Sequence, residues 1–123
     1  MINVIVTGGR DNNNVANVER CIKAFVKNKP YGVRFFLGDC PTGIDCIAQK
    51  LCDKYGFDYN VYFADWARFG RAAGPRRNEA MVDSALAATM DGDTVLCLSF
   101  SGGRGTKNCT RYAARKGARV IFA

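Results

Sequence analysis

The sequence predicts a single α/β domain over residues 1–123, with a Rossmann-like three-layer arrangement of helices on both faces of a five-stranded parallel sheet. Three observations favour this fold class. Short apolar segments alternate strictly with longer segments of helical periodicity. Glycine-rich segments follow the first and the fourth of the predicted strands. The length of 123 residues suits one domain, and the sequence contains no repeat or linker.

In the first half of the chain, apolar segments predict two strands and two helices, and each helix ends at a proline or a glycine. Residues 2–6 are almost continuously apolar, which is typical of a strand covered on both faces. Apolar residues then recur at helical spacing over 15–26 and stop before a proline. Residues 33–37 predict a second strand, and residues 44–55 a second helix that ends at Gly56, because glycine tolerates a left-handed backbone.

The second half of the chain continues the same alternation. Apolar residues alternate with others over 57–63, which predicts a third strand, and the segment 64–74 has no period and predicts a loop. Pro75 suits the first turn of a third helix, since that position needs no amide donor. The remaining predicted elements are a strand over 94–98, a basic helix that runs to Lys116 and ends at Gly117, and a strand over 119–122.

The order of the elements places the two glycine-rich segments together. Right-handed crossovers predict strand order 3-2-1-4-5, so strands one and four are neighbours at the switch point, where such sheets bind ligands. Gly8-Gly9 follows the first strand, and Gly102–Gly105 follows the fourth and leads into a helix. Free amides at that helix start favour a phosphate, and Thr106 suits either a capping role or a hydroxyl contact with the ligand. The alternative is a pair of tight turns without a ligand.

Arg77 is the candidate side chain for a phosphate contact. It lies one helical turn before Met81, which is predicted to face the sheet, so its guanidinium should point to the mouth of the cleft. An ordinary surface arginine is the alternative. Asp39 and Asp45 bracket the loop after the second strand, and Asp45 suits the amino end of the next helix as well as a ribose. Asp11 is open to similar alternatives.

Composition narrows the class of protein. The net charge is +7, and six basic residues but no acidic one follow Asp93, which favours a phosphate-bearing partner over a merely solvated basic face. No apolar run is long enough for a membrane span and no signal peptide is visible, so we expect a cytoplasmic protein without a membrane partner.

Six cysteines without a CxxC pair or any histidine predict reduced, mostly buried thiols and no metal site. Neither GxGxxG nor a P-loop occurs, and no cofactor is predicted.

Four motifs occur in the order seen in a known family. They are Thr7-Gly8-Gly9-Arg10-Asp11, Gly38-Asp39-Cys40-Pro41-Thr42-Gly43-Ile44-Asp45, Gly74-Pro75-Arg76-Arg77-Asn78 with Met81, and Gly102-Gly103-Arg104-Gly105-Thr106. Over nearly the whole chain this pattern resembles the cpYpsA-related family of the SLOG superfamily, which joins Smf/DprA-like DNA-processing proteins with LOG-type phosphoribohydrolases. The resemblance implies a homodimer and a nucleotide or nucleotide-derived ligand. Its binding residues would be Gly8, Gly9, Arg10, Gly38, Asp39, Asp45, Arg77, Asn78, Gly102, Gly103, Arg104, Gly105 and Thr106.

The resemblance to the LOG-type enzymes is incomplete at one decisive position. Their Arg-[Lys/Asn]-x-x-Met motif is matched from Arg77 to Met81, but their Pro-Gly-Gly-x-Gly-Thr-x-x-Glu motif has Ser101 for the proline and Cys109 for the catalytic glutamate. Cleavage of an N-glycosidic bond passes through a cationic sugar that a carboxylate stabilises. We therefore expect Cys109 to be a packed thiol and the protein to be a binding module. The alternative is hydrolysis of a nucleoside 5′-monophosphate, with Arg77 in the catalytic site.

A third hypothesis is that the basic C-terminal residues bind single-stranded DNA. It is less favoured, because proteins that bind single strands without sequence preference stack the bases on aromatic side chains. Aromatic residues are not clustered among these arginines.

Overall fold

Strands and helices alternate along the chain in the computed structural model, which describes residues 2–27, 32–89 and 94–123. The strands are β1 (Ile2–Thr7), β2 (Val33–Gly38), β3 (Asp58–Tyr62), β4 (Leu96–Ser99) and β5 (Arg119–Phe122). The helices are α1 (Val15–Val26), α2 (Gly43–Tyr55), α3 (Trp66–Phe69), α4 (Ala73–Ala87) and α5 (Arg104–Arg115), with a 3₁₀ turn η1 (Gly70–Ala72) before α4.

The sheet is parallel throughout and has the order β3-β2-β1-β4-β5, as predicted. β1 lies in the centre, where Ile5 pairs in register with Phe36 of β2 and Cys97 of β4. This position explains why residues 2–6 are almost continuously apolar: both faces of the central strand are covered. The switch point therefore lies between β1 and β4, as the sequence predicts.

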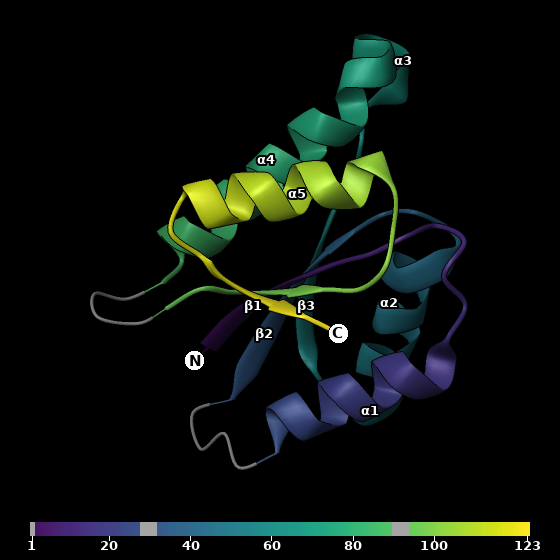
Figure 1. The fold of residues 1–123 in the computed structure, drawn as a ribbon, viewed down its shortest axis with the longest axis vertical. Helices are drawn as coiled ribbons and strands as arrows, with labels where there is room; N and C mark the ends of the chain where they lie inside the picture. Colours follow the sequence, from purple (N-terminus) through teal and green to yellow (C-terminus); the bar gives the residue numbers. More distant parts are fainter. Residues whose placement is uncertain (1, 28–31, 90–93) are drawn as a thin grey trace.

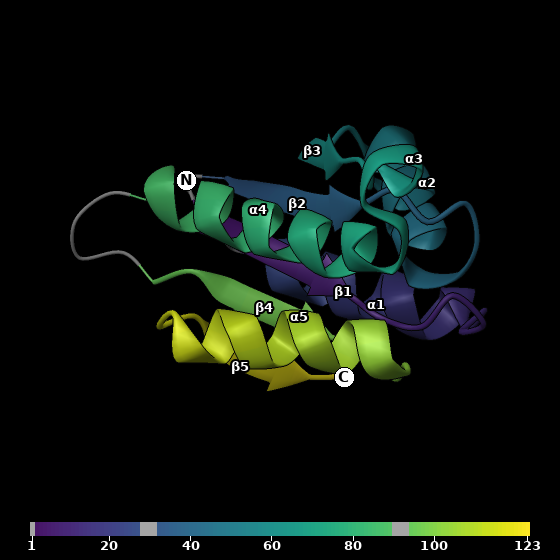
Figure 2. The ribbon, with the colours of Figure 1, turned by 90° about the horizontal axis from the view of Figure 1, so that it is seen from above.

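Helices cover both faces of the sheet, with α1 and α2 on one side and α4 and α5 on the other (Figure 1). A view turned by 90° shows α4 and α5 side by side over their face (Figure 2). Val4 and Val6 pack into the cluster with α1 and α2, whereas Ile5 between them packs into the cluster with α4 and α5. The alternating side chains of one strand thus contribute to two separate cores.

The prediction of a loop over residues 64–74 is wrong, because the chain forms α3 and η1 there and α4 begins at Ala73. The local cause is Asp65, whose carboxylate accepts a hydrogen bond from the Arg68 amide at 3.1 Å and caps α3. The guanidinium of Arg76 also lies over the Phe69 ring, 4.3 Å from its centroid. Pro75 does lie in the first turn of α4, as predicted.

Smaller differences concern the ends of the other elements. β3 is shorter than predicted, and the residue after it, Phe63, is 77% exposed. β4 begins at Leu96 rather than Thr94, since Leu96 is the first residue paired in register with β1 and β5. α5 ends at Arg115, one residue before the predicted end at Lys116. Gly56, at the end of α2, has a left-handed φ of +73°, as predicted. Pro30 lies outside the described residues.

The six cysteines are all free. Cys52, Cys97 and Cys109 are buried, but the other three are half-buried, so burial is less complete than predicted. In the described part of the chain, no group of three or more cysteine or carboxylate side chains is placed to hold a metal ion. None of the described helices has the length and apolarity needed to cross a membrane.

Two phenylalanines test the packing of the core. Phe36 is 1% exposed under α4, so Phe36→Ala should lower the free energy of unfolding by about 3–5 kcal/mol, through lost transfer energy and a residual cavity. The control is Phe63→Ala, because Phe63 is 77% exposed and its loss should change stability by less than about 0.5 kcal/mol. Urea denaturation followed by circular dichroism measures both. Equal losses would contradict the described core.

Candidate functional site

An open cleft lies beyond the carboxyl ends of the strands, with a volume of about 1430 Å³. The segments after β1, β2 and β4 and the start of α4 form its walls. All thirteen residues predicted to bind a ligand line it: Gly8, Gly9, Arg10, Gly38, Asp39, Asp45, Arg77, Asn78, Gly102, Gly103, Arg104, Gly105 and Thr106. The fold therefore brings four separate sequence motifs to one place.

The two glycine-rich loops contact each other at the base of the cleft. The Phe100 amide donates to the Thr7 carbonyl and the Gly9 amide donates to the Ser101 carbonyl, both at 2.9 Å, so the β1–β4 ladder continues into the loops. A Cβ atom on Gly102 would lie 2.6 Å from the Gly9 nitrogen and 2.1 Å from Thr106 Oγ1. Gly102 is thus required by the approach of the protein's own backbone, whether or not a ligand binds.

The loop after β1 also holds the start of α2. The Gly9 carbonyl accepts from the Ile44 amide at 3.2 Å, and Thr42 Oγ1 donates to the Arg10 carbonyl at 2.9 Å. Gly43 has φ of +72°, and a Cβ there would lie 2.2 Å from the Gly9 oxygen. Gly8 packs against Ile44, where a Cβ would overlap the side chain at 2.3 Å. Gly8 therefore serves the packing of α2 as well as lining the cleft.

The first amides of α5 face no capping side chain. Gly103 is the N-cap residue, and no side-chain hydrogen bond caps the helix. Of the two roles considered for Thr106, the structure contradicts capping of α5: the Thr106 side chain is buried, and its Oγ1 lies against Gly102. Because the first N–H groups of a helix have no intrahelical acceptor, this end of α5 presents donors and the positive end of the helix dipole to the cleft.

Arg77 lies on the side of α4 that faces the cleft, one turn from the buried Met81, as predicted. Its Nη1 forms an ion pair with Asp39 Oδ1 at 2.5 Å, and its Nε donates to Asn78 Oδ1 at 2.9 Å. These contacts use two of the five guanidinium N–H donors and hold the group in one orientation. Arg77 is therefore a pre-oriented cation rather than a free surface arginine.

Asp39 and Asp45 are both bound to backbone amides. Asp39 Oδ2 accepts from the Ala64 amide at 3.2 Å, which ties the loop after β2 to the segment before α3. Asp45 Oδ2 accepts from the Cys40 amide at 3.2 Å, so it holds the loop that precedes α2. Burial raises the pKa of Asp45 above its usual value, against the opposing effects of the Cys40 amide and the Arg77 charge. This arrangement favours the structural role for Asp45.

Gly38 leaves room for these charges. A Cβ at this position would lie 2.6 Å from Asp45 Oδ2 and 2.7 Å from Arg77 Nη1. The Asp45 carboxylate and the Arg77 guanidinium therefore both lie against Gly38 at the end of β2. A side chain at this position would displace them.

Asn78, predicted to contact the ligand, lines the cleft and also joins α4 to α5. It is buried, and its Nδ2 lies 3.3 Å from both the Gly105 carbonyl and Asn108 Oδ1, on α5. Since its Oδ1 accepts from Arg77, one side chain connects the guanidinium to the amino end of α5.

Sequence reasoning missed several residues that line the cleft. Trp66 is the most distinctive: it is 53% exposed, and its ring packs beside Gly74, where a Cβ would lie 3.4 Å from Cη2. Arg71 and Asn108 also line the cleft. A detectable signal was the single tryptophan of the chain within an arginine- and glycine-rich segment.

Cys109 is fully buried on the sheet side of α5, as expected of a packed thiol. Burial raises its pKa to about 11, so the neutral thiol predominates at pH 7. It does not line the cleft. Neither a thiolate nucleophile nor a substitute for a carboxylate is available at this position.

No protein-family model and no curated protein sequence matches this chain. The fold and the site alone define its class: a Rossmann-like α/β domain with an open cleft at the switch point of its sheet.

The contact between the glycine loops predicts unequal effects of two similar substitutions. Gly102→Ala should lower the free energy of unfolding by about 1–3 kcal/mol, because the methyl group meets the Gly9 backbone. Gly105→Ala, in the first turn of α5, meets no atom within 4 Å and should change stability by less than about 1 kcal/mol, in the stabilising direction. Thermal and urea denaturation measure both. A Gly102→Ala variant as stable as Gly105→Ala would contradict this contact.

The buried carboxyl of Asp45 predicts a specific pH dependence. Because its pKa is higher in the folded than in the unfolded chain, the wild type should lose stability relative to Asp45→Asn as pH rises above about 4. The relative gain of the variant at pH 7 should be about 1.4 kcal/mol for each unit by which the pKa is raised. Urea unfolding at pH 3 and pH 7 measures it, with the exposed Asp58→Asn as control. A gain that is the same at both pH values would refute this account.

Proposed function

We propose that this protein binds a nucleotide or nucleotide-derived ligand in the cleft, with a phosphate at the amino end of α5. The observation that carries the proposal is the uncapped start of α5 beside the glycine loop, at the switch point of a parallel sheet. Backbone amides and a helix dipole at such a position favour an anion. The four motifs that resemble the cpYpsA-related SLOG family support the same ligand class.

The remaining groups of the cleft suit the rest of a nucleotide. The phosphate would lie on the amides of Gly102–Thr106, with Arg77 donating through the N–H groups that Asp39 and Asn78 leave free. The ribose and base would lie against Gly8-Gly9 and the loop from Asp39 to Asp45. Trp66 lines the same cleft with half of its surface exposed, so its ring is available for stacking against the base.

Hydrolysis of a nucleoside 5′-monophosphate has weaker support. The thiol of Cys109 is buried and neutral, so it supplies neither the anion nor the base that cleavage of an N-glycosidic bond requires. Asp39 lines the cleft, but its two oxygens already accept from Arg77 and Ala64. Chromatography after incubation with nucleoside monophosphates tests the alternative: free base that disappears in Arg77→Ala would establish it.

A homodimer and a cytoplasmic location belong to the same proposal. The dimer is expected from the family resemblance, because in the proteins that this chain resembles, neighbouring chains often complete each other's clefts. Sedimentation velocity tests it, and a species with the mass of one chain at micromolar concentration would contradict the dimer.

Binding in the cleft can be followed through the chain's only tryptophan. Nucleoside monophosphates, NAD derivatives and cyclic dinucleotides should be screened by Trp66 fluorescence and calorimetry. Gly103→Val should weaken any binder at least about tenfold, because the side chain covers the α5 amides while its Cβ meets no atom within 4 Å. Arg77→Ala should weaken binding similarly, and Lys50→Ala, on α2 outside the cleft, should leave it unchanged. The absence of any binder at millimolar concentration, or full affinity in Gly103→Val, would refute the proposal.

A further inference from the structure

The outer face of α5 carries a continuous stripe of positive charge. At 100° per residue, the four cations of the stripe fall within about 80° of arc on the helix surface. They are Arg104, Lys107, Arg111 and Arg115, and all four are exposed. The buried residues of the same helix lie on its opposite side, against the sheet: Thr106, Cys109 and Ala113. The stripe therefore faces away from the core.

The stripe does not stabilise the helix that carries it. α5 contains no acidic residue, so the like charges of Lys107, Arg111 and Arg115 repel at four-residue spacing. Arg104 adds a positive charge at the positive end of the helix dipole. Within residues 2–27, 32–89 and 94–123, the single ion pair joins Arg77 and Asp39, so none of the four cations forms an ion pair with a carboxylate there. An external anion would remove this repulsion.

The stripe lines a groove of about 310 Å³ between α4 and α5. Its walls contain the four cations and a single carboxylate, that of Glu79. The neighbouring carboxylate of Asp83 is already bound to the Tyr112 hydroxyl, at 2.8 Å. The groove is therefore strongly positive, and its charge is complementary to a polyanion rather than to an apolar or a mixed surface.

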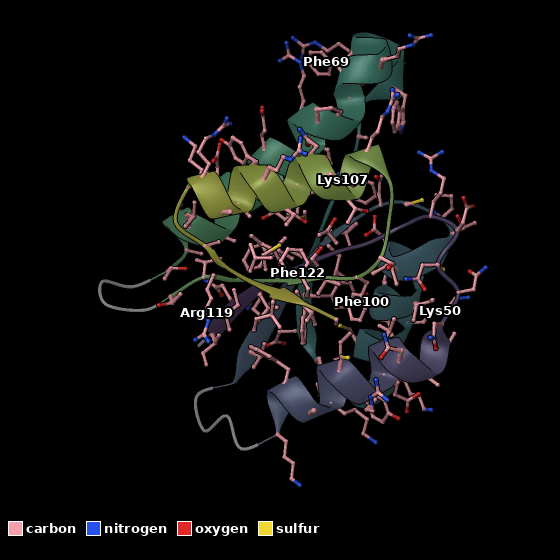
Figure 3. The ribbon with its side chains drawn as sticks, in the orientation of Figure 1. Lys50, Phe69, Phe100, Lys107, Arg119 and Phe122 are labelled. Atoms are coloured by element: carbon pink, nitrogen blue, oxygen red, sulfur yellow. The ribbon has the colours of Figure 1, made fainter. Side chains whose placement is uncertain are left out.

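The length of the stripe fits an extended polyanion. From Arg104 to Arg115 it covers about 16 Å along the helix axis, with a cation about once per turn. Figure 3 shows Lys107 on α5 and Lys50 on α2, two helices that cover opposite faces of the sheet. Arg104 and Asn108 line both the groove and the cleft, which makes the two neighbours.

We propose that this groove, defined by Arg104, Lys107, Arg111 and Arg115, docks the phosphodiester backbone of double-stranded nucleic acid without reading its sequence. A duplex carries one negative charge per about 1.7 Å of its axis, a dense row of anions for a row of cations to follow. A single strand would require exposed aromatic faces for stacking. Among the described residues that line the groove, Tyr112 is the only aromatic one, and its ring lies under Arg115 at 5.4 Å and Lys116 at 5.5 Å.

The test removes charge from the groove and leaves the cleft intact. Lys107→Gln, Arg111→Gln and Arg115→Gln are combined in one variant, because none of these residues lines the cleft. The matched control combines Arg20→Gln, Lys27→Gln and Lys50→Gln, three exposed cations in and beside α1 and α2, and so lowers the net charge by the same amount. The probe is a fluorescein-labelled 20-base-pair DNA duplex, whose anisotropy is measured from 50 to 300 mM KCl.

For the wild type we expect binding that weakens steeply with salt. The groove variant should bind at least tenfold more weakly at 50 mM KCl, and its plot of log affinity against log salt should be shallower by about 0.9 for each cation removed. The control variant should keep its affinity within threefold. Thermal denaturation should show both variants folded, and a groove variant that unfolds is replaced by Arg111→Gln alone, for which a third of the slope change is expected.

Several results would overturn the proposal. They are equal binding by the groove and control variants, no duplex binding at 50 mM KCl, and tighter binding to a 20-nucleotide single strand, to polyglutamate or to vesicles of anionic lipid than to the duplex. The proposal is independent of the nucleotide cleft, since Gly103→Val should leave duplex binding within threefold of the wild type.

Discussion

The hydrogen bond from the Gly9 amide to the Ser101 carbonyl is the constraint on which the cleft depends. It carries the pairing of β1 with β4 past the ends of both strands, so the two loops lie against each other instead of diverging. The carbonyl of the same residue accepts from Ile44 and holds the start of α2. Three of the loops around the cleft are thus tied to one residue, which tolerates no Cβ on its neighbour Gly102.

Charge within the cleft serves mainly to position its walls. Asp39 holds both Arg77 and the segment before α3, and Asp45 holds the loop before α2. Asn78 then connects Arg77 to α5. With these side chains engaged by the protein, the backbone amides at the start of α5 are donors without a capping partner. The same helix packs on the sheet through one face and presents four exposed cations on the other, so one element contributes to the core, the cleft and the groove.

The fold was predictable because the sequence patterns that indicate its strands and helices each span only a few residues. Each buried strand is an apolar run, each of the four long helices has its own buried stripe, and alternation with right-handed crossovers leaves few sheet orders. The segment 64–74 was not predictable from periodicity, since α3 has four residues and no buried face. Its formation depends on the Asp65 cap and on Arg76, which covers Phe69 from the next helix. A capping search around Asp65 would have found the start of α3, but not the contact with Arg76.

The sequence by itself determined the sheet order and the edge at which the cleft lies, because hydrophobic periodicity and glycine-rich turns act over a few residues. The thirteen residues expected at that edge were given by the four motifs and the family resemblance that they carry. The tertiary structure alone decided how those residues are used. It engages Arg77 with Asp39, turns Asn78 into a link between helices, directs Thr106 toward Gly102 and brings Trp66 to the cleft. These outcomes depend on distances between segments that are far apart along the chain, and such distances are set only when the helices pack on the sheet.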